Sequence, residues 1–525
     1  MGLPSAVRVE KLEVYHEDYH YYKNTWDTIS DLREGATAIV KKAAHYLPPR
    51  PGEQSDIYAL RLQKISYTPV MATAIREFTA KLSSSPVYLS GTNEDDFWEA
   101  FRDATDGKNK DEVELLTQIF SCLLYFGRVY VAVDRPKLGL QPRSAFEDAE
   151  LPNQPYAAVY EPLNVINWGE NWYISRQIVT ANKPLEEPVK LGRWTVWTDE
   201  VIAVYEAPIR LDKDQSTVVE IKVDGHWRSI NDPRALVPGE LTLHELGQCP
   251  MVSLTLPHEM WTGNNVYLKQ LQHFRIESSW TDAGIMAGTI QRVFTPLPPP
   301  PADDPRVVFE EPDYSQIQAD NAHVLVGADF KFQESSGSAI ASLTSQLETI
   351  ERQIKALVSM SFSSVSKGAV EQSGASKEVD MALLQDSMRA YGTKVAQLYQ
   401  DVLRLVALSS SKSDEIAVSG LDEYGVNTLS DMLDNAEKLE PIAQNIPPTA
   451  LKLWYGKLAN LLAGSRSAEM DQAIAKELEE IFKPEQEDPE DATEALDPED
   501  PANLDALIAA FGVSPEEARY ILNGA

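Results

Sequence analysis

The stretch "SSVSKGAVEQSGASKEVD", residues 363–380, separates two of the strongest helical patterns in the chain. Before it, apolar residues recur every three or four positions, at Ile340, Leu343, Leu347, Ile350, Ile354 and Leu357. After it the same spacing resumes, at Met381, Leu384, Met388, Tyr391, Val395, Leu398, Val402 and Leu405. This spacing predicts amphipathic α-helices, and the Ser- and Gly-rich residues between them predict a flexible loop.

Both predicted helices are long. At 1.5 Å per residue, residues 339–362 would span roughly 35 Å and residues 379–409 roughly 46 Å. The second helix repeats its apolar positions about every 3.5 residues, so one of its faces is expected to contact neighbouring helices along the whole length. For either helix taken alone, an ordinary buried helix remains the alternative.

The region before these helices predicts an α+β body over residues 1–265. "WDTISDLREGATAIVKKAAHYLPP" (26–49) predicts a helix that ends at the prolines, and residues 58–86 predict two more. "RVYVAVD" (128–134) predicts a strand after a buried helix. "TVVEIKVDGHWRSI" (217–230) carries an Asp-Gly pair between alternating apolar residues, which predicts a hairpin.

An insert lies between helix 266–288 and helix 339–362. It contains "TPLPPPPADDP" (295–305), which cannot continue a helix or a central strand. Three short strands are predicted in it, "RVVFEE" (306–311), "HVLVG" (323–327) and "FKFQ" (330–333), the last two joined by a hairpin-like turn. About fifty residues are few for an independent core, so we expect the insert to pack against copies of itself.

Composition restricts the possible partners. The chain has 47 basic and 80 acidic residues, a formal net charge of −33. General affinity for nucleic acid or an anionic membrane needs basic excess, so any DNA contact must be local; the acidic balance can also reflect solubility alone.

Cys122 and Cys249 are predicted to be buried thiols of a reducing compartment. No signal peptide or membrane-spanning run is found, which predicts a soluble cytoplasmic product.

Several catalytic motifs are missing from the sequence. It contains no phosphate-binding G-x-x-x-x-G-K-[ST], no G-x-G-x-x-G and no G-x-S-x-G, whereas "HEDYH" (16–20) matches the pattern H-E-x-x-H. His16 and His20, with Glu17 and Asp18, could hold a metal on a helix. The aromatic residues interleaved with them and the lack of a third ligand favour a packed surface segment. We therefore predict no enzyme, no metal and no cofactor.

Several segments resemble portal proteins of tailed bacteriophages, and in particular a portal family long labelled as a domain of unknown function. They are "REGATAIVKKAAHYLP" (33–48), "YALRLQKISYTP" (58–69), "LLYFGRVYVAVDRP" (123–136), "PYAAVYEPLNVINW" (155–168) and "HELGQCPMVSL" (244–254). The resemblance covers about residues 25–260, and the order of helices extends it to about 410. The C-terminal hundred residues depart from the family's pattern.

The resemblance implies a portal-like α+β architecture. Its parts are a wing (1–265), a first stem helix (266–288), a clip (289–338), a second stem helix (339–362), a tunnel loop (363–378), a long spine helix (379–410), wing completion with crown-like helices (411–483), an acidic tether (484–501) and a C-terminal helical tail (502–525). The tether has nine acidic residues, no basic residue and four prolines, which is typical of disorder.

The resemblance also implies the function of the family. It would be a homo-oligomeric ring, twelve subunits by family habit, at one vertex of the capsid. Double-stranded DNA would pass through the ring during packaging and ejection, and the terminase motor, a head–tail adaptor, and the major capsid and scaffolding proteins would be its partners. The protein would be made in the host cytoplasm and reside in the virion, with no membrane partner. Alternatives are another oligomeric tail or baseplate protein and, more remotely, an enzyme of unrecognised motif.

The portal-like topology also implies roles for particular residues at the channel and between subunits. Loop residues expected to contact DNA are Lys367 and Lys377 with Ser366 and Ser376, although a disordered surface loop is the simpler reading of the loop alone. Residues off the apolar seam of helix 339–362, expected at the channel wall, are Glu348, Arg352 and Lys355. Seam residues expected to pack between subunits are Ile340, Leu343, Leu347, Ile350, Ile354 and Leu357.

Overall fold

The computed structural model describes most of the first 424 residues. The described residues are 3–91, 96–136, 154–182, 184, 187–212, 217–244, 246–288, 291–296, 328–333, 338–359, 374–410, 412, 415–422, 424, 451, 455 and 476. The chain divides into two compact units, residues 1–424 and 425–525. Only three residues of the second unit are described, so the account below concerns the first unit.

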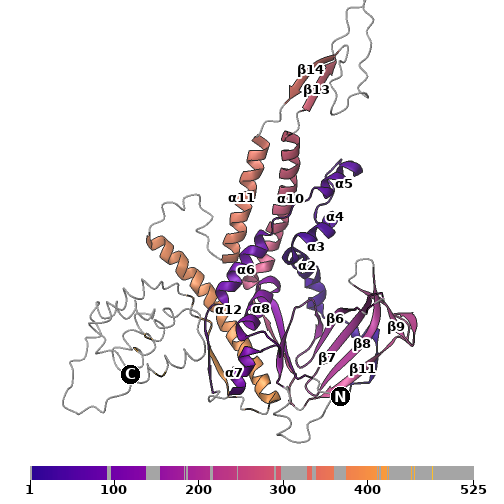
Figure 1. Ribbon diagram of the computed structural model, residues 1–525, viewed down its shortest axis with the longest axis vertical. Helices are drawn as coiled ribbons and strands as arrows, with labels where there is room; N and C mark the ends of the chain where they lie inside the picture. The colour runs from indigo at the N-terminus through magenta and orange to yellow at the C-terminus, as the bar shows by residue number, and fades with distance from the viewer. Residues whose placement is uncertain are drawn as a thin grey trace, which may run out of the picture. The chain divides into compact units, whose positions relative to one another are not determined.

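The first unit is a mixed α+β fold (Figure 1). Its helices are α1 (Val9–Leu12), α2 (Glu17–Glu34), α3 (Ala36–Lys41), α4 (Ala43–Tyr46), α5 (Ser55–Gln63), α6 (Val70–Leu82), α7 (Asp96–Asp103), α8 (Glu112–Phe126), η1 (His258–Met260), α10 (Thr262–Gly288), α11 (Ser338–Ser359) and α12 (Gly374–Ser409). The sequence-based prediction of an α+β chain is confirmed at this level.

The largest sheet has eight strands in the order β1-β11-β8-β7-β6-β5, with β9 pairing β8 and β10 pairing β9. Its strands are β1 (Ala6–Arg8), β5 (Val165–Trp168), β6 (Tyr173–Ala181), β7 (Val189–Trp197), β8 (Val201–Leu211), β9 (Val218–Val223), β10 (His226–Ser229) and β11 (Leu236–Leu243). All of its pairs are antiparallel.

Among the described residues there are three smaller sheets. One has the order β12-β3-β4, built from β3 (Arg128–Asp134), β4 (Tyr156–Tyr160) and β12 (Met251–Thr255). The second pairs β2 (Val87–Ser90) with β15 (Ala417–Gly420), and the third pairs β13 (Gln291–Pro296) with β14 (Ala328–Gln333). The β2–β15 pair joins the end of the unit to the segment that follows α6.

Helix α8 and strand β3 lie in the middle of the core. Most side chains of α8 are buried, including every one from Cys122 to Phe126, as expected for a strongly apolar helix. Its last carbonyl groups have no partner within the helix, and two tryptophans supply one. The indole N–H of Trp26 donates to the Phe126 carbonyl at 3.1 Å, and that of Trp261 donates to the Tyr125 carbonyl at 2.8 Å. These bonds join α2 and the start of α10 to the end of α8.

The predicted single helix over residues 26–49 is wrong. The helical segment is divided into α2, α3 and α4, and the first break lies at Gly35, whose φ is +90°. A residue with a side chain is strained at this φ, so glycine suits a sharp change of direction between two helices. The prediction followed the apolar spacing and passed over the glycine.

Other predictions in the body agree with the structure. Helices α5 and α6 lie on either side of Pro69, and the strand predicted at 128–134 is β3. The Asp-Gly hairpin is β9–β10, with φ of 50° at Asp224 and 79° at Gly225, the conformation that an Asp-Gly turn provides.

The region around the insert differs from the prediction in its boundaries. Helix α10 begins at Thr262 instead of 266, and α12 begins at Gly374 instead of 379. Strand β14 contains the predicted "FKFQ", but it pairs with β13, which was not recognised as a strand. The predicted strands 306–311 and 323–327 lie outside the described residues, as do most of the segments predicted after residue 420.

Candidate functional site

Helices α10 and α11 form an antiparallel pair, 27 and 22 residues long, that we call the stem pair (Figure 1). The indole N–H of Trp280 donates to Thr344 Oγ1 at 3.1 Å, and His273 Nε2 lies 3.4 Å from Glu351 Oε1. The later residue of α10 thus contacts the earlier residue of α11, so the two helices run in opposite directions. Strands β13 and β14 pair from Gln291↔Gln333 to Pro296↔Ala328, which brings together the two ends of the insert between these helices.

The lower part of the stem pair is fixed to the body by polar contacts on α10. Glu277 accepts hydrogen bonds from Ser66 Oγ at 2.9 Å and from the Thr68 backbone N–H at 3.1 Å. Gln270 accepts from the Met71 backbone N–H at 2.8 Å and donates to the Thr68 carbonyl at 2.9 Å. These bonds satisfy backbone groups of the segment that leads into α6, and they hold α10 rigidly against it.

The predicted apolar seam of α11 changes character along the helix. Its C-terminal half packs against α6, and Ile350 and Ile354 are buried there. The remaining members of the seam, Ile340, Leu343, Leu347 and Leu357, are only partly buried. The half of the seam before Ile350 is therefore incompletely covered in a single chain, and the placement of Leu347 is compatible with the predicted contact between subunits.

The three predicted channel-wall residues lie off the apolar seam of α11 and are at least partly exposed. Glu348 and Lys355 are exposed, and Arg352 is partly exposed with its Nη2 3.2 Å from Thr349 Oγ1. Their separation from the seam agrees with the helical spacing. That these residues face a channel stays a prediction.

The predicted loop residues fall into two groups. Ser366 and Lys367 lie outside the described residues. Ser376 and Lys377 lie in the first turn of α12, because this helix begins five residues earlier than predicted. Gly374 and Ala375 belong to the predicted loop, but in the structure they begin α12, because a glycine is tolerated at the end of a helix.

The other end of α12 is anchored in the core. The Tyr399 hydroxyl donates to Glu112 Oε1 at 2.7 Å, and the Tyr391 hydroxyl bonds to the Met260 carbonyl. Both rings are buried. Helix α12 is thus held to α8 and to the start of the stem pair, while its first turn contains the last residues of the predicted loop.

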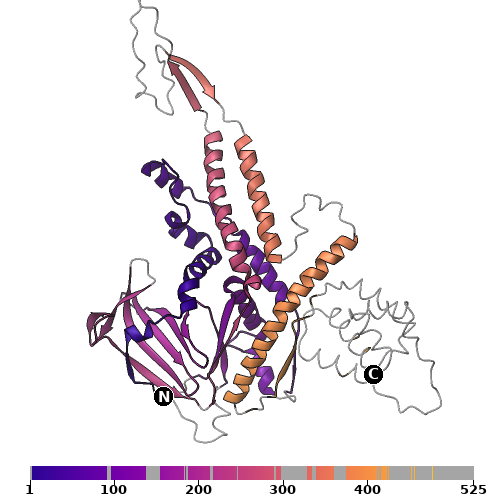
Figure 2. The same cartoon turned by 180° about the vertical axis from the view of Figure 1, so that it is seen from behind.

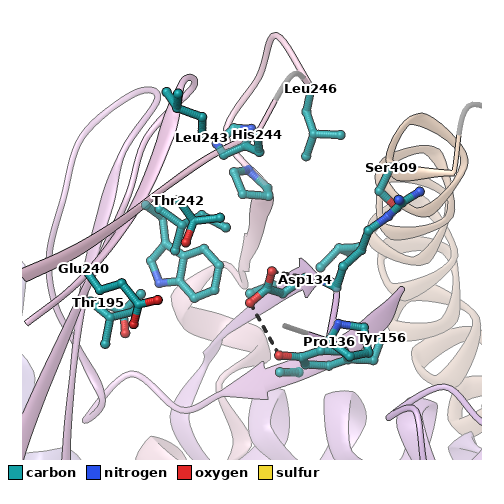
Figure 3. Close-up of a pocket in the computed structure, with 18 of the residues that line it drawn as sticks. Asp134, Pro136, Tyr156, Thr195, Glu240, Thr242, Leu243, His244, Leu246 and Ser409 are labelled. Carbon is teal, nitrogen blue, oxygen red and sulfur yellow. Dashed lines mark hydrogen bonds between the residues drawn. The ribbon is translucent and has the colours of Figure 1, made fainter. Parts of the chain in front are cut away.

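A cleft of about 1130 Å³ lies between the large sheet and the β12-β3-β4 sheet (Figure 3). The Tyr156 hydroxyl donates to Asp134 Oδ2 at 3.4 Å across its floor. Burial raises the pKa of the Tyr160 hydroxyl to about 12 and that of the nearby Cys249 thiol to about 12. Burial of this kind keeps the groups neutral, the opposite of what activates a nucleophile. Sequence reasoning did not predict this cleft, because strands distant in the sequence form it.

The histidine segment is a structural part of α2. His16 caps this helix by accepting from the Asp18 backbone N–H at 3.1 Å, and its ring stacks on Trp168 at 4.0 Å. Among the described residues, no group of three or more His, Cys, Asp or Glu could hold a metal ion. None of the described helices is sufficiently long and apolar to span a membrane.

Comparisons with known proteins give limited similarity. No protein-family model matches the chain, and no curated protein sequence matches it. One similar solved structure is described as the neck of an empty gene transfer agent (GTA) particle computed with C6 symmetry, with 11% identity, a TM-score of 0.34, and coverage of 81% of this chain and 95% of that one. Another is from the virion of a native gene transfer agent particle, with 10% identity, a TM-score of 0.33, and coverage of 81% and 94%. TM-scores of this size do not establish a common fold.

Proposed function

We propose that this chain is a phage portal protein, which assembles into a ring at one capsid vertex and surrounds double-stranded DNA during packaging and ejection. The ring would present a docking site to the terminase motor and to a head–tail adaptor. The observation that carries this proposal is the antiparallel stem pair, bracketing an insert with paired ends and followed by the 36-residue α12.

The incomplete burial of the stem supports assembly. A helix pair whose apolar seam is partly exposed before Ile350 gains stability when neighbouring chains cover that seam. A contact between different faces of identical chains generates a ring if the rotation closes. The small β13–β14 insert would be stabilised by the same assembly, because it is too short for a core of its own.

The charge distribution suits a channel through which DNA slides. A formal charge of −33 repels DNA in general, so the grip on DNA would be confined to a few lysines. Lys377 lies in the first turn of α12, where the exposed backbone N–H groups of a helix start also favour an anion. Lys367 would add a second contact from each chain. Repeated around a ring, these weak contacts sum to an appreciable and salt-sensitive interaction.

Imaging of the purified full-length protein tests the proposal. We expect closed rings with a central hole in negative-stain micrographs and a single multiple of the 58.5 kDa chain mass in native mass measurement. A fibre or an open filament without a closed hole would instead favour the alternative of another tail or baseplate protein. A stable monomer at all concentrations would contradict the portal assignment.

The loop lysines give a second prediction. Replacing Lys367 and Lys377 with Ser should leave ring assembly unchanged and lower the DNA content of particles that carry the variant, because each ring loses two phosphate contacts per chain. Replacing Lys41 and Lys81, two exposed lysines outside α11 and α12, is the matched control and should have no effect. Normal DNA content in the loop variant would exclude these lysines from the grip.

A further inference from the structure

We propose that the exposed apolar face of α5 docks against α11 of a neighbouring copy of this chain. The face consists of Ile57 and Leu60, which are 51% and 53% exposed and lie three residues apart on one side of the helix. We call it the α5 face. The proposal rests on the proposed function, because it names the contact by which neighbouring chains of the ring would recognise one another.

The α5 face is held in place by its own segment. Arg61 forms two hydrogen bonds with Glu53, Nε to Oε1 at 2.8 Å and Nη2 to Oε2 at 2.6 Å, and both side chains are almost completely covered. The bonds from Arg61 lower the pKa of Glu53 to about 2, so the pair stays charged near neutral pH. The Tyr58 hydroxyl donates to the Leu47 carbonyl at 3.0 Å. A rigid segment that presents two large apolar side chains to solvent loses little conformational entropy when it docks.

The segment carrying the α5 face lies on the side of α10 away from α11, in both views (Figures 1 and 2). Arg50, just before α5, forms a 2.7 Å ion pair with Asp282 and a 3.3 Å hydrogen bond with Ser279. The α5 face of a chain therefore cannot reach α11 of the same chain, since α10 stands between them.

The two surfaces lie at the same level along the stem pair. Arg50 ties the α5 segment to positions 279 and 282 of α10, and the Trp280–Thr344 hydrogen bond ties the same level of α10 to Thr344 of α11. Leu343 and Leu347, on either side of Thr344, belong to the partly exposed part of the seam. A rotation about an axis parallel to the stem pair preserves this level. In a ring of that kind, the α5 face of one chain meets the Leu343–Leu347 region of the next.

The charges beside the two surfaces are complementary. Asp56 and Lys64 are exposed beside the α5 face, while Glu348 is exposed and Arg352 partly exposed beside Leu347. Each surface thus offers one acidic and one basic group at its margin, and opposite signs can pair across the contact. Groups of this kind at a rim fix the register and exclude wrong pairings more than they add affinity.

Charged substitutions on the α5 face test the proposal in the full-length protein. The double variant Ile57→Asp, Leu60→Asp should fold like the parent and should raise the chain concentration needed for half-assembly by about tenfold or more, since each 1.4 kcal/mol of lost contact energy is a factor of ten. Val113→Asp is the matched control, because Val113 is an apolar helical residue that is also 53% exposed. It should leave assembly unchanged.

Cross-linking tests the partner directly. A chain with Leu60→Cys and a chain with Leu347→Cys are mixed, assembled and treated with a short bis-maleimide. We expect covalent dimers in the mixture and not in either variant alone, and a ladder up to the full ring when both cysteines are in one chain. The parent, with only Cys122 and Cys249, gives the background.

The outcomes separate this inference from the proposed function. If the parent forms no ring, the proposed function fails. If the parent and the α5 double variant assemble equally well, or if assembled rings give no cross-link between positions 60 and 347, the α5 face is not the contact, whereas the ring itself stands.

Discussion

Replacing Gly392 with Ala is expected to lower the free energy of unfolding by about 3 kcal/mol. A Cβ at this position of α12 would lie 1.6 Å from the Leu421 carbonyl oxygen and 2.7 Å from the Tyr424 hydroxyl. The nearest atom belongs to the backbone, so the clash cannot be relieved by turning a side chain. Overpacking of a well-packed site typically costs 1 to about 3 kcal/mol or more. To relieve the clash, the segment after β15 would have to move. This segment is held in place, because the Leu421 N–H donates to the Pro86 carbonyl at 3.0 Å.

The direction in which Gly392→Ala changes the stability distinguishes a steric clash from an effect of helix propensity. In an exposed helix interior, Gly→Ala stabilises by about 1 kcal/mol, because alanine has the higher helix propensity. Gly284 of α10 is such a position, since a Cβ there would meet nothing within 4 Å, and Gly284→Ala is the matched control. Urea unfolding of the two variants should give midpoint shifts of opposite direction. A rise in both midpoints would show that α12 does not pack against Leu421 as described.

Local signals in the sequence account for much of the fold. The continuous apolar run of α8, the Asp-Gly turn of β9–β10 and the periodic spacing of α10, α11 and α12 each depend on residues a few positions apart. Such patterns predict the type of an element well and its ends less well. The starts of α10 and α12 were misplaced by four and five residues for this reason.

Long-range pairing could not be predicted in the same way. Strands β2 and β15 pair from Ser90↔Ala417 to Val87↔Gly420, across more than three hundred residues. Each is only four residues long, and nothing in either strand specifies the other. Strand β13 was likewise not predicted, because its partner β14 lies beyond the proline-rich segment. The cleft was not predicted either, because residues of two separate sheets line it.

The sequence indicates which residues share one face of α11, because that follows from helical spacing alone. Their roles between subunits and at a channel stay predictions. The greater burial of Ile350 and Ile354 was not predicted, since it depends on the position of α6. The α5 face was missed because Ile57 and Leu60 look like ordinary core positions of a short helix. Only their exposure in the fold distinguishes them.

The second large effect is expected at Arg176, which forms a buried ion pair with Glu13. The distance from Arg176 Nη1 to Glu13 Oε2 is 2.9 Å, and the two side chains are only 8% and 4% exposed. The other carboxylate oxygen of Glu13 accepts from the Trp194 indole N–H at 2.8 Å, and Tyr15 contributes a further hydroxyl. This network fastens the segment after α1 to strands β6 and β7.

Arg176→Met should lower the free energy of unfolding by about 3–5 kcal/mol, because it leaves the Glu13 carboxylate buried without its counter-charge. Adding Glu13→Gln to this variant should restore part of the loss, since the uncompensated charge is then gone and the amide can still accept from Trp194. The matched control is Arg193→Met on β7. Arg193 pairs with Glu206 at 2.7 Å, but these side chains are 44% and 38% exposed, and an exposed pair contributes at most about 1 kcal/mol. Equal losses for Arg176→Met and Arg193→Met in urea unfolding would contradict the burial of the Glu13 pair, whereas a loss at Arg176 that the second substitution partly reverses would identify buried charge as the cause.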